Sequence, residues 1–188
     1  MKVLSLLLAC FWGYHLFAQQ GTDSLSTKEK ALLLNISYFA PYGIQYDQPE
    51  RYEQYLKIPF EDSSVQYDYH FSYTEPGRPL FYVRHSVSLE KSLKDAANAF
   101  LSDEITMQEQ FAGKLASQPI TNLYSYGQES HCLLLLEKGV PTGMIYRYRK
   151  DKLVGSITLI GLYFDNANDF KEFIVPIIRQ TEQAYKAL

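Results

Sequence analysis

The last third of the chain constrains the fold most, because a strand hairpin there leads directly into one long amphipathic helix. Residues 144–149 alternate in character, which is typical of a strand with one covered face. A short polar turn at residues 150–152 separates them from an almost wholly apolar run, residues 153–164. A strand that is covered on both faces has this composition, so the two runs predict an antiparallel hairpin.

Large apolar residues then recur at helical spacing, and they define one stripe along a helix. Residues 165–168 supply turn and cap side chains before it. Pro176 lies inside the stripe and removes one backbone donor, so we expect a kink there or a helix whose regular part begins at Pro176. The preceding strand is the nearest partner, and the helix should lie flat over the sheet. The stripe consists of Phe170, Phe173, Ile174, Ile177, Ile178 and Tyr185.

A second hairpin is predicted in the first half of the chain. Residues 65–73 alternate cleanly between aromatic or aliphatic and polar side chains, and residues 80–87 form the return strand. Residues 74–77 contain the Pro and Gly that a tight turn requires. Ser88 is a candidate N-cap for a helix that we expect at about residues 89–101.

The remaining segments carry weaker patterns. Residues 104–117 fit either a helix or a strand, and residues 31–39 fit either a first strand or a short helix. Residues 51–57 are charged and rich in tyrosine, which suggests a short helical turn. Residues 120–126 and 131–137 are predicted strands that precede the closing hairpin.

These elements predict the α+β class, with an antiparallel sheet of about six or seven strands flanked by two main helices. Residues 31–188 form one domain in this interpretation. Four features recur together: the opening at residues 42–49, the strand end Val87-Ser88-Leu89 leading into residues 91–97, the strands within residues 131–164, and the helix start Asp169-Phe170. This pattern resembles the Mog1/PsbP family of α-β-α sandwiches, whose members serve mainly as binding or assembly-assisting modules without shared catalytic residues. The resemblance therefore implies a binding role and assigns no site residue.

The N-terminus has the composition of a secretory signal peptide. A basic start and an apolar stretch end at the small residue Ala18, so we expect residues 1–18 to be removed and residues 19–30 to form a flexible leader. The stretch is too short and too polar at its end for a transmembrane helix. The protein should therefore be periplasmic or secreted. In an alternative interpretation, residues 7–10 form a lipobox and Cys10 carries a lipid anchor.

Charge and cysteine content exclude several classes of function. The formal net charge of the 188 residues is −3 and no Lys/Arg cluster stands out, so no nucleic acid partner is expected. Cleavage after Ala18 would leave Cys132 as the sole cysteine, which cannot form an internal disulfide. Cys132 lies in an apolar run, so we expect a buried, unreactive thiol.

Histidines offer one route to a catalytic or metal site. His70 and His85 lie on the two strands of the predicted first hairpin, where they could meet and bind a metal together with Asp68. The alternative is a solvated His70 and a half-buried, hydrogen-bonded His85. Motifs of zinc proteases, serine hydrolases and nucleotide-binding proteins are absent from the sequence. We therefore predict no catalytic residue, no metal site and no cofactor.

The tyrosines have two interpretations, as the edges of the core or as an exposed binding surface. The alternation of the strands favours the core for most of them. The best candidates for a contact patch are Tyr146, Arg147, Tyr148 and Arg149, where arginine and tyrosine are interleaved.

The sequence thus predicts an exported, non-catalytic binding or assembly-assisting protein of the bacterial cell envelope, whose partner is another envelope protein. One alternative is a periplasmic hydrolase or metal-dependent enzyme that uses His70 or His85. Another is an inhibitor or immunity-type protein against a secreted partner, which the sequence does not distinguish from the first.

Overall fold

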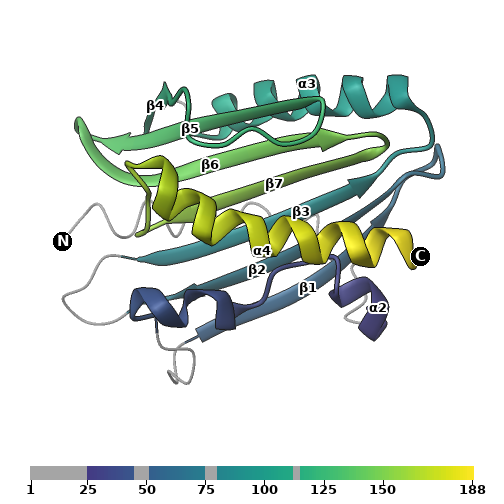
Figure 1. Ribbon diagram of the computed structural model, residues 1–188, viewed down its shortest axis with the longest axis horizontal. Helices are drawn as coiled ribbons and strands as arrows, with labels where there is room; N and C mark the ends of the chain where they lie inside the picture. The colour runs from purple at the N-terminus through teal and green to yellow at the C-terminus, as the bar shows by residue number, and fades with distance from the viewer. Residues whose placement is uncertain (1–24, 45–50, 75–79, 112–114) are drawn as a thin grey trace.

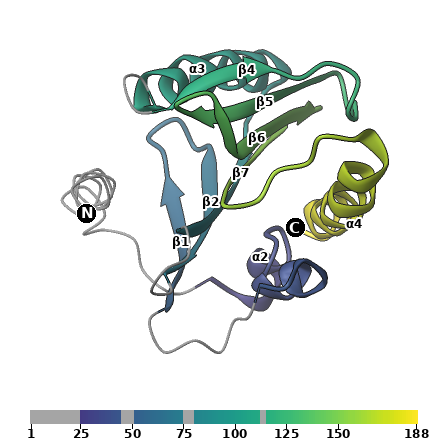
Figure 2. The ribbon, with the colours of Figure 1, turned by 90° about the vertical axis from the view of Figure 1, so that its left-hand side faces the viewer.

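The computed structural model describes the backbone of residues 25–44, 51–74, 80–111 and 115–188, and the side chains of these residues outside 103–114. Seven strands form one antiparallel sheet with helices on both faces (Figure 1, Figure 2). The α+β class and the predicted number of strands are confirmed. The predicted signal peptide, its cleavage site after Ala18 and the lipid anchor at Cys10 lie outside the described residues.

The order of strands across the sheet is β1-β2-β3-β7-β6-β5-β4, so the last strand in the chain lies at the centre. β7 joins the two predicted hairpins by pairing with β3 on one side and with β6 on the other. The strands are β1 (Arg51–Pro59), β2 (Val65–Tyr73), β3 (Phe81–Leu89), β4 (Ala116–Pro119), β5 (Glu129–Glu137), β6 (Val140–Lys150) and β7 (Leu153–Ile160). The helices are α2 (Thr27–Lys30), the 3₁₀ helix η1 (Ile36–Tyr42), α3 (Leu93–Phe111) and α4 (Ala167–Lys186).

α4 lies across one face of the sheet, as the apolar stripe predicted. Asn166 caps its first turn by accepting a hydrogen bond from the Asp169 N–H at 2.9 Å. Burial of each large side chain of the stripe stabilises the fold by roughly 1.5–3 kcal/mol before entropy is counted. The helix continues through Pro176 as one element. Its buried residues are Phe170, Phe173, Ile174, Ile177, Ile178 and Thr181.

The two faces of the sheet follow from the strand register. In β2 and β3 the odd-numbered residues face α4 and η1, and Tyr73 lies opposite Phe81 at the turn. This confirms the predicted hairpin and its faces. On the other face α3 packs against β7, where Ala96 and Phe100 contact Val154 (Figure 2).

α3 begins later and ends later than predicted. β3 continues to Leu89, which pairs with Val65 on β2 and Leu153 on β7, so these residues belong to the sheet. The cap is Ser92 rather than Ser88, because the Asp95 N–H donates to Ser92 Oγ at 3.1 Å. The ambiguous residues 104–117 divide between the two expected structures: α3 runs to Phe111 and β4 starts at Ala116.

The predictions for three other segments were wrong. Residues 51–57 belong to strand β1, because Tyr55 packs on Tyr69 of the neighbouring strand with ring centroids 4.8 Å apart. Residues 120–126 are irregular and contain no strand. The described part of the predicted flexible leader, residues 25–30, forms the capped helix α2 with Leu25 buried.

The pattern of residues 31–39 fits either a strand or a helix, and in the structure they form a turn and then most of η1. Leu32, Leu33 and Leu34 are buried. Within the described residues, no helix combines the length and the hydropathy that crossing a bilayer would require.

Candidate functional site

The predicted contact patch on β6 lies mostly inside the protein. Tyr146, Arg147 and Tyr148 are each at most 1% exposed. β6 runs between β5 and β7, α4 covers its tyrosine face, and the Arg147 guanidinium lies 4.6 Å from the ring of Phe100 on α3. The prediction of an exposed patch was therefore wrong for these three residues. Arg149 is half-buried, and its Nε lies 2.5 Å from the Glu129 carboxylate.

The two histidines of the predicted metal site lie on opposite faces of the sheet. His85 pairs with Tyr69 and His70 pairs with Arg84, so the imidazoles cannot converge. His85 is fully buried, and its Nδ1 accepts a hydrogen bond from the Leu34 N–H at 2.9 Å. Burial lowers the pKa of His85 to about 3, although the Asp68 charge opposes the shift. The described residues contain no cluster of three metal-ligating side chains.

An ionic network does form around Asp68, on the α3 side of β2 and β3. The carboxylate is 2% exposed, and it accepts hydrogen bonds from Arg84 Nη2 at 2.7 Å and from Gln66 Nε2 at 2.9 Å. His70 Nε2 lies 3.5 Å from the carboxylate, and His70 Nδ1 lies 3.4 Å from the Tyr82 hydroxyl. The sequence placed Asp68 and His70 on one face, but it gave no sign that the carboxylate is buried.

The network keeps Asp68 charged. Burial favours the neutral acid, but the Arg84 charge, with hydrogen bonds from His70 and Ser86, outweighs it and holds the pKa of Asp68 well below its usual range. The ion pair thereby fixes Arg84 and His70 on the sheet surface. With its charge already paired, Asp68 is suited to a structural role and not to proton transfer.

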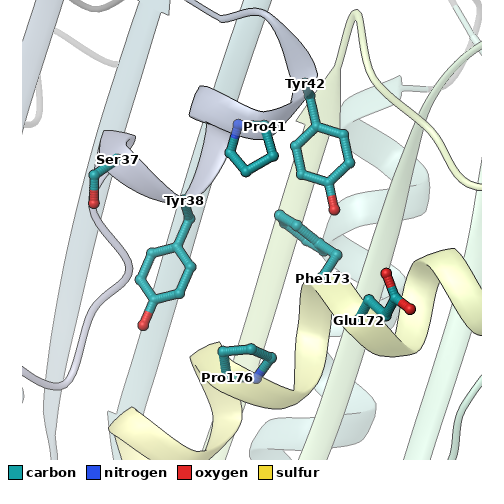
Figure 3. Close-up of a pocket in the computed structure, with 7 residues that line it drawn as sticks. All are labelled: Ser37, Tyr38, Pro41, Tyr42, Glu172, Phe173 and Pro176. Atoms are coloured by element: carbon teal, nitrogen blue, oxygen red, sulfur yellow. The ribbon is translucent and has the colours of Figure 1, made fainter.

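An open cleft lies between η1 and α4. Its volume is about 380 Å³, within the range of ligand pockets. The two tyrosines and one proline of η1 face a carboxylate, a phenylalanine and a proline of α4 (Figure 3). The residues that line the cleft are Ser37, Tyr38, Pro41, Tyr42, Glu172, Phe173 and Pro176.

Local hydrogen bonds determine where η1 begins and ends. Asn35 caps its first turn by accepting from the Ser37 N–H at 2.9 Å. Gly43 ends it with φ at 76°, a left-handed conformation that glycine adopts without strain, and its N–H donates to the Ala40 carbonyl. The 3₁₀ helix is thus limited to seven residues, which places Tyr38 and Tyr42 on the side of α4.

Hydrogen bonds connect the part of the cleft around Tyr38 to α4 and to the segment before η1. The Tyr38 hydroxyl donates to Gln180 Oε1 at 2.6 Å. Gln180 Nε2 in turn donates to the carbonyls of Ala31 and Leu33 at 3.0 and 2.8 Å. Thr181 Oγ1 adds a hydrogen bond to the Leu32 carbonyl at 2.8 Å. The side of the cleft near Tyr38 is therefore held by a chain of buried and half-buried hydrogen bonds.

The Tyr42 wall is held by aromatic packing. Its ring meets Phe164 and Phe173 edge-to-face, with centroids 5.4 and 5.8 Å apart. Burial, then the charges of Glu172 and Asp169, raise the pKa of Tyr42, so its hydroxyl stays protonated at neutral pH. Within the described part of the chain, Glu172 forms no ion pair, and the cleft therefore has a negative rim. The sequence does not reveal this site, because η1 has no clear periodicity and lies far from α4 along the chain.

Comparisons with known proteins identify no relatives by sequence. No protein-family model matches the chain, and no curated protein matches it. Among solved structures, the chain is similar to the extracellular domain of PknH from Mycobacterium tuberculosis, at 12% identity and a TM-score of 0.46. The match covers 88% of this chain and 100% of that one. Agreement at this level does not support transfer of a family or a function.

Proposed function

We propose that this chain is an exported, non-catalytic binding module of the bacterial cell envelope, and that its η1–α4 cleft holds a segment of another envelope protein. The observation that carries the proposal is a hollow of about 380 Å³ whose two tyrosine walls are already fixed by hydrogen bonds and aromatic contacts. Walls that need no ordering reduce the entropy cost of binding.

The exported state rests on the sequence of residues 1–18. N-terminal sequencing of the protein recovered from a periplasmic fraction tests it. A chain that starts at Gln19 supports the proposal, whereas a lipid-modified Cys10 supports the anchored alternative.

The metal-dependent form of the enzyme alternative required His70 and His85 to bind a metal together, and they lie on different faces of the sheet. A hydrolase that uses one of the two histidines stays an alternative. An inhibitor or immunity-type protein would also act by binding, and the same cleft would serve it. The difference lies in the partner, which the experiment below would reveal.

We also propose that the three-layer arrangement is of the Mog1/PsbP type, as the sequence pattern suggested. Support comes from an antiparallel sheet with one main helix on each face. An experimental structure of this chain, compared strand by strand with members of that family, tests the assignment. A different order of strands in those members would reject it.

Site-specific photo-cross-linking tests the binding role. A photoreactive phenylalanine analogue at Ser37, an exposed residue on the rim of the cleft, should capture one defined partner in cells. The same analogue at Gln118, exposed on the short edge strand β4, is the matched control. Capture at Ser37 that is no stronger or more selective than capture at Gln118 would reject the cleft as the binding site.

A further inference from the structure

We infer that the cleft accepts a lysine or arginine side chain, carried on an extended segment of the partner protein. The inference rests on the proposed function and specifies the chemistry that the cleft recognises. Three features of the cleft carry it: a backbone carbonyl without its usual helical donor, a carboxylate without an ion-pair partner among the described residues, and two fixed aromatic rings.

Pro176 creates the backbone acceptor. In an α-helix the carbonyl of residue 172 accepts a hydrogen bond from the N–H of residue 176, and proline has no N–H. The Glu172 carbonyl therefore lacks its usual helical donor. Glu172 and Pro176 both line the cleft (Figure 3), so the helix turn that carries this acceptor forms part of the α4 wall. A donor supplied by a ligand would satisfy it.

The Glu172 side chain adds a negative charge to the same wall. It is exposed, and no basic side chain among the described residues pairs with it. Asp169, one turn earlier, contributes to the same negative potential at Tyr42. An ammonium or guanidinium group has several donors and a positive charge, and it could bond both acceptors of Glu172 at once.

The tyrosine rings of η1 favour a cation over other donors. A Lys or Arg group over the face of an aromatic ring is attracted by its quadrupole, and its aliphatic stem packs on apolar surface. Tyr38, Tyr42 and Pro41 offer such surface opposite Glu172 (Figure 3). A neutral apolar side chain would displace the water that is bonded to the Glu172 carbonyl and carboxylate and would offer no donor in its place. This loss of hydrogen bonds opposes binding.

A neighbouring hollow indicates how the segment runs. It has a volume of about 420 Å³, shares Glu172 and Pro176 with the cleft, and is otherwise lined by Asn168, Lys171 and Val175. A segment that crosses α4 at Pro176 would place its next residue beside the Lys171 ammonium. The partner should therefore carry one basic residue followed or preceded by a neutral or acidic one.

Titration of the exported protein with short capped peptides tests the inference. Three peptides of identical glycine-rich sequence would differ at one central position, which is lysine, its neutral isostere norleucine, or glutamate. The lysine peptide should shift the NMR signals of Tyr38 and Tyr42, and should bind at least about tenfold more tightly than the norleucine peptide. Addition of salt should weaken binding of the lysine peptide and should not weaken binding of the norleucine peptide.

Two variants separate the contributions of the acceptors. Glu172→Gln and Pro176→Ala should each weaken binding of the lysine peptide by about fivefold or more, and neither should weaken binding of the norleucine peptide. Glu61→Gln, an exposed position in the β1–β2 turn, is the control and should have no effect. Relative to the wild type, the Pro176→Ala protein should bind the lysine peptide more weakly and should unfold at a higher temperature. Damage to the fold cannot produce both effects together.

Equal affinity for the lysine and norleucine peptides, or a lysine peptide that causes no shift at Tyr38 and Tyr42, would overturn the inference. Neither result decides the proposed function, which the Ser37 cross-link tests independently. A partner captured at Ser37 whose binding is unaffected by Glu172→Gln and Pro176→Ala would leave the cleft as a binding site and remove the basic side chain from it.

Discussion

Asp68→Asn probes the ionic network on β2 and β3, because it removes one charge and keeps the shape of the side chain. The carboxylate is 2% exposed and lies 2.7 Å from Arg84 Nη2. Removal of one member of a buried ion pair costs about 3–5 kcal/mol. Arg84 keeps 27% of its side chain exposed, so water partly replaces the lost partner and we expect a loss of about 3 kcal/mol at neutral pH.

The loss should depend on pH with a defined sign. Asp68 has a lowered pKa in the folded protein because Arg84, His70 and Ser86 outweigh its burial. Its charge therefore contributes stability that is fully present above the unfolded pKa of about 4 and is lost as the pH falls toward the folded pKa. The asparagine variant lacks this contribution, so the difference in unfolding free energy between the two proteins should shrink below about pH 4.

Urea unfolding at a series of pH values measures both effects. Glu61→Gln, at an exposed position in the β1–β2 turn, is the control and should follow the wild-type curve at every pH. An Asp68→Asn variant within about 0.5 kcal/mol of wild type at neutral pH would refute the reasoning, since surface substitutions have effects of that size. A difference that stays constant on acidification would equally refute it.

Three other predictions follow from single contacts. Pro176→Ala should raise the free energy of unfolding by up to about 3 kcal/mol in chemical denaturation, because alanine restores the hydrogen bond to the Glu172 carbonyl. Gly155→Ala should lower it by about 1–3 kcal/mol or more in the same assay, since a Cβ would lie 2.1 Å from the Tyr148 ring. Burial raises the pKa of Cys132 to about 12, so an aromatic disulfide reagent should modify this thiol only after unfolding; rapid reaction of the folded protein would contradict this.

The parts of the fold that could be predicted are those whose pattern is complete within a short segment. The α4 stripe has its large side chains at helical spacing, and the β2–β3 hairpin alternates over both strands. In these segments the spacing of apolar residues within one helix or strand is regular, so periodicity alone identifies the buried face. β1 is different: its burial alternates only weakly, and it becomes a strand by pairing with β2.

The burial of Arg147 shows a second limit. An arginine in an alternating strand normally marks the solvent face, and the two arginines of β6 were interpreted in that way. Yet Arg147 is 1% exposed, because α3 packs over its face and offers the Phe100 ring and carbonyl to the guanidinium. No feature of residues 140–150 specifies where α3 will lie. The η1–α4 cleft was missed for the same reason, since all seven strands lie between its two walls in the sequence.

Under the proposed function, α4 has two roles that place opposite demands on its sequence. The buried stripe of α4 holds the sheet, and this role favours an uninterrupted helix. Pro176 is exposed and contributes nothing to that stripe, while it removes a helical hydrogen bond from Glu172. Pro176 and Glu172 line the cleft together with Tyr38 and Tyr42, so this loss falls in the α4 wall of the proposed binding site. A helix that only stabilised the core would be more stable with alanine at this position, so a proline here agrees with the proposed binding role of the cleft.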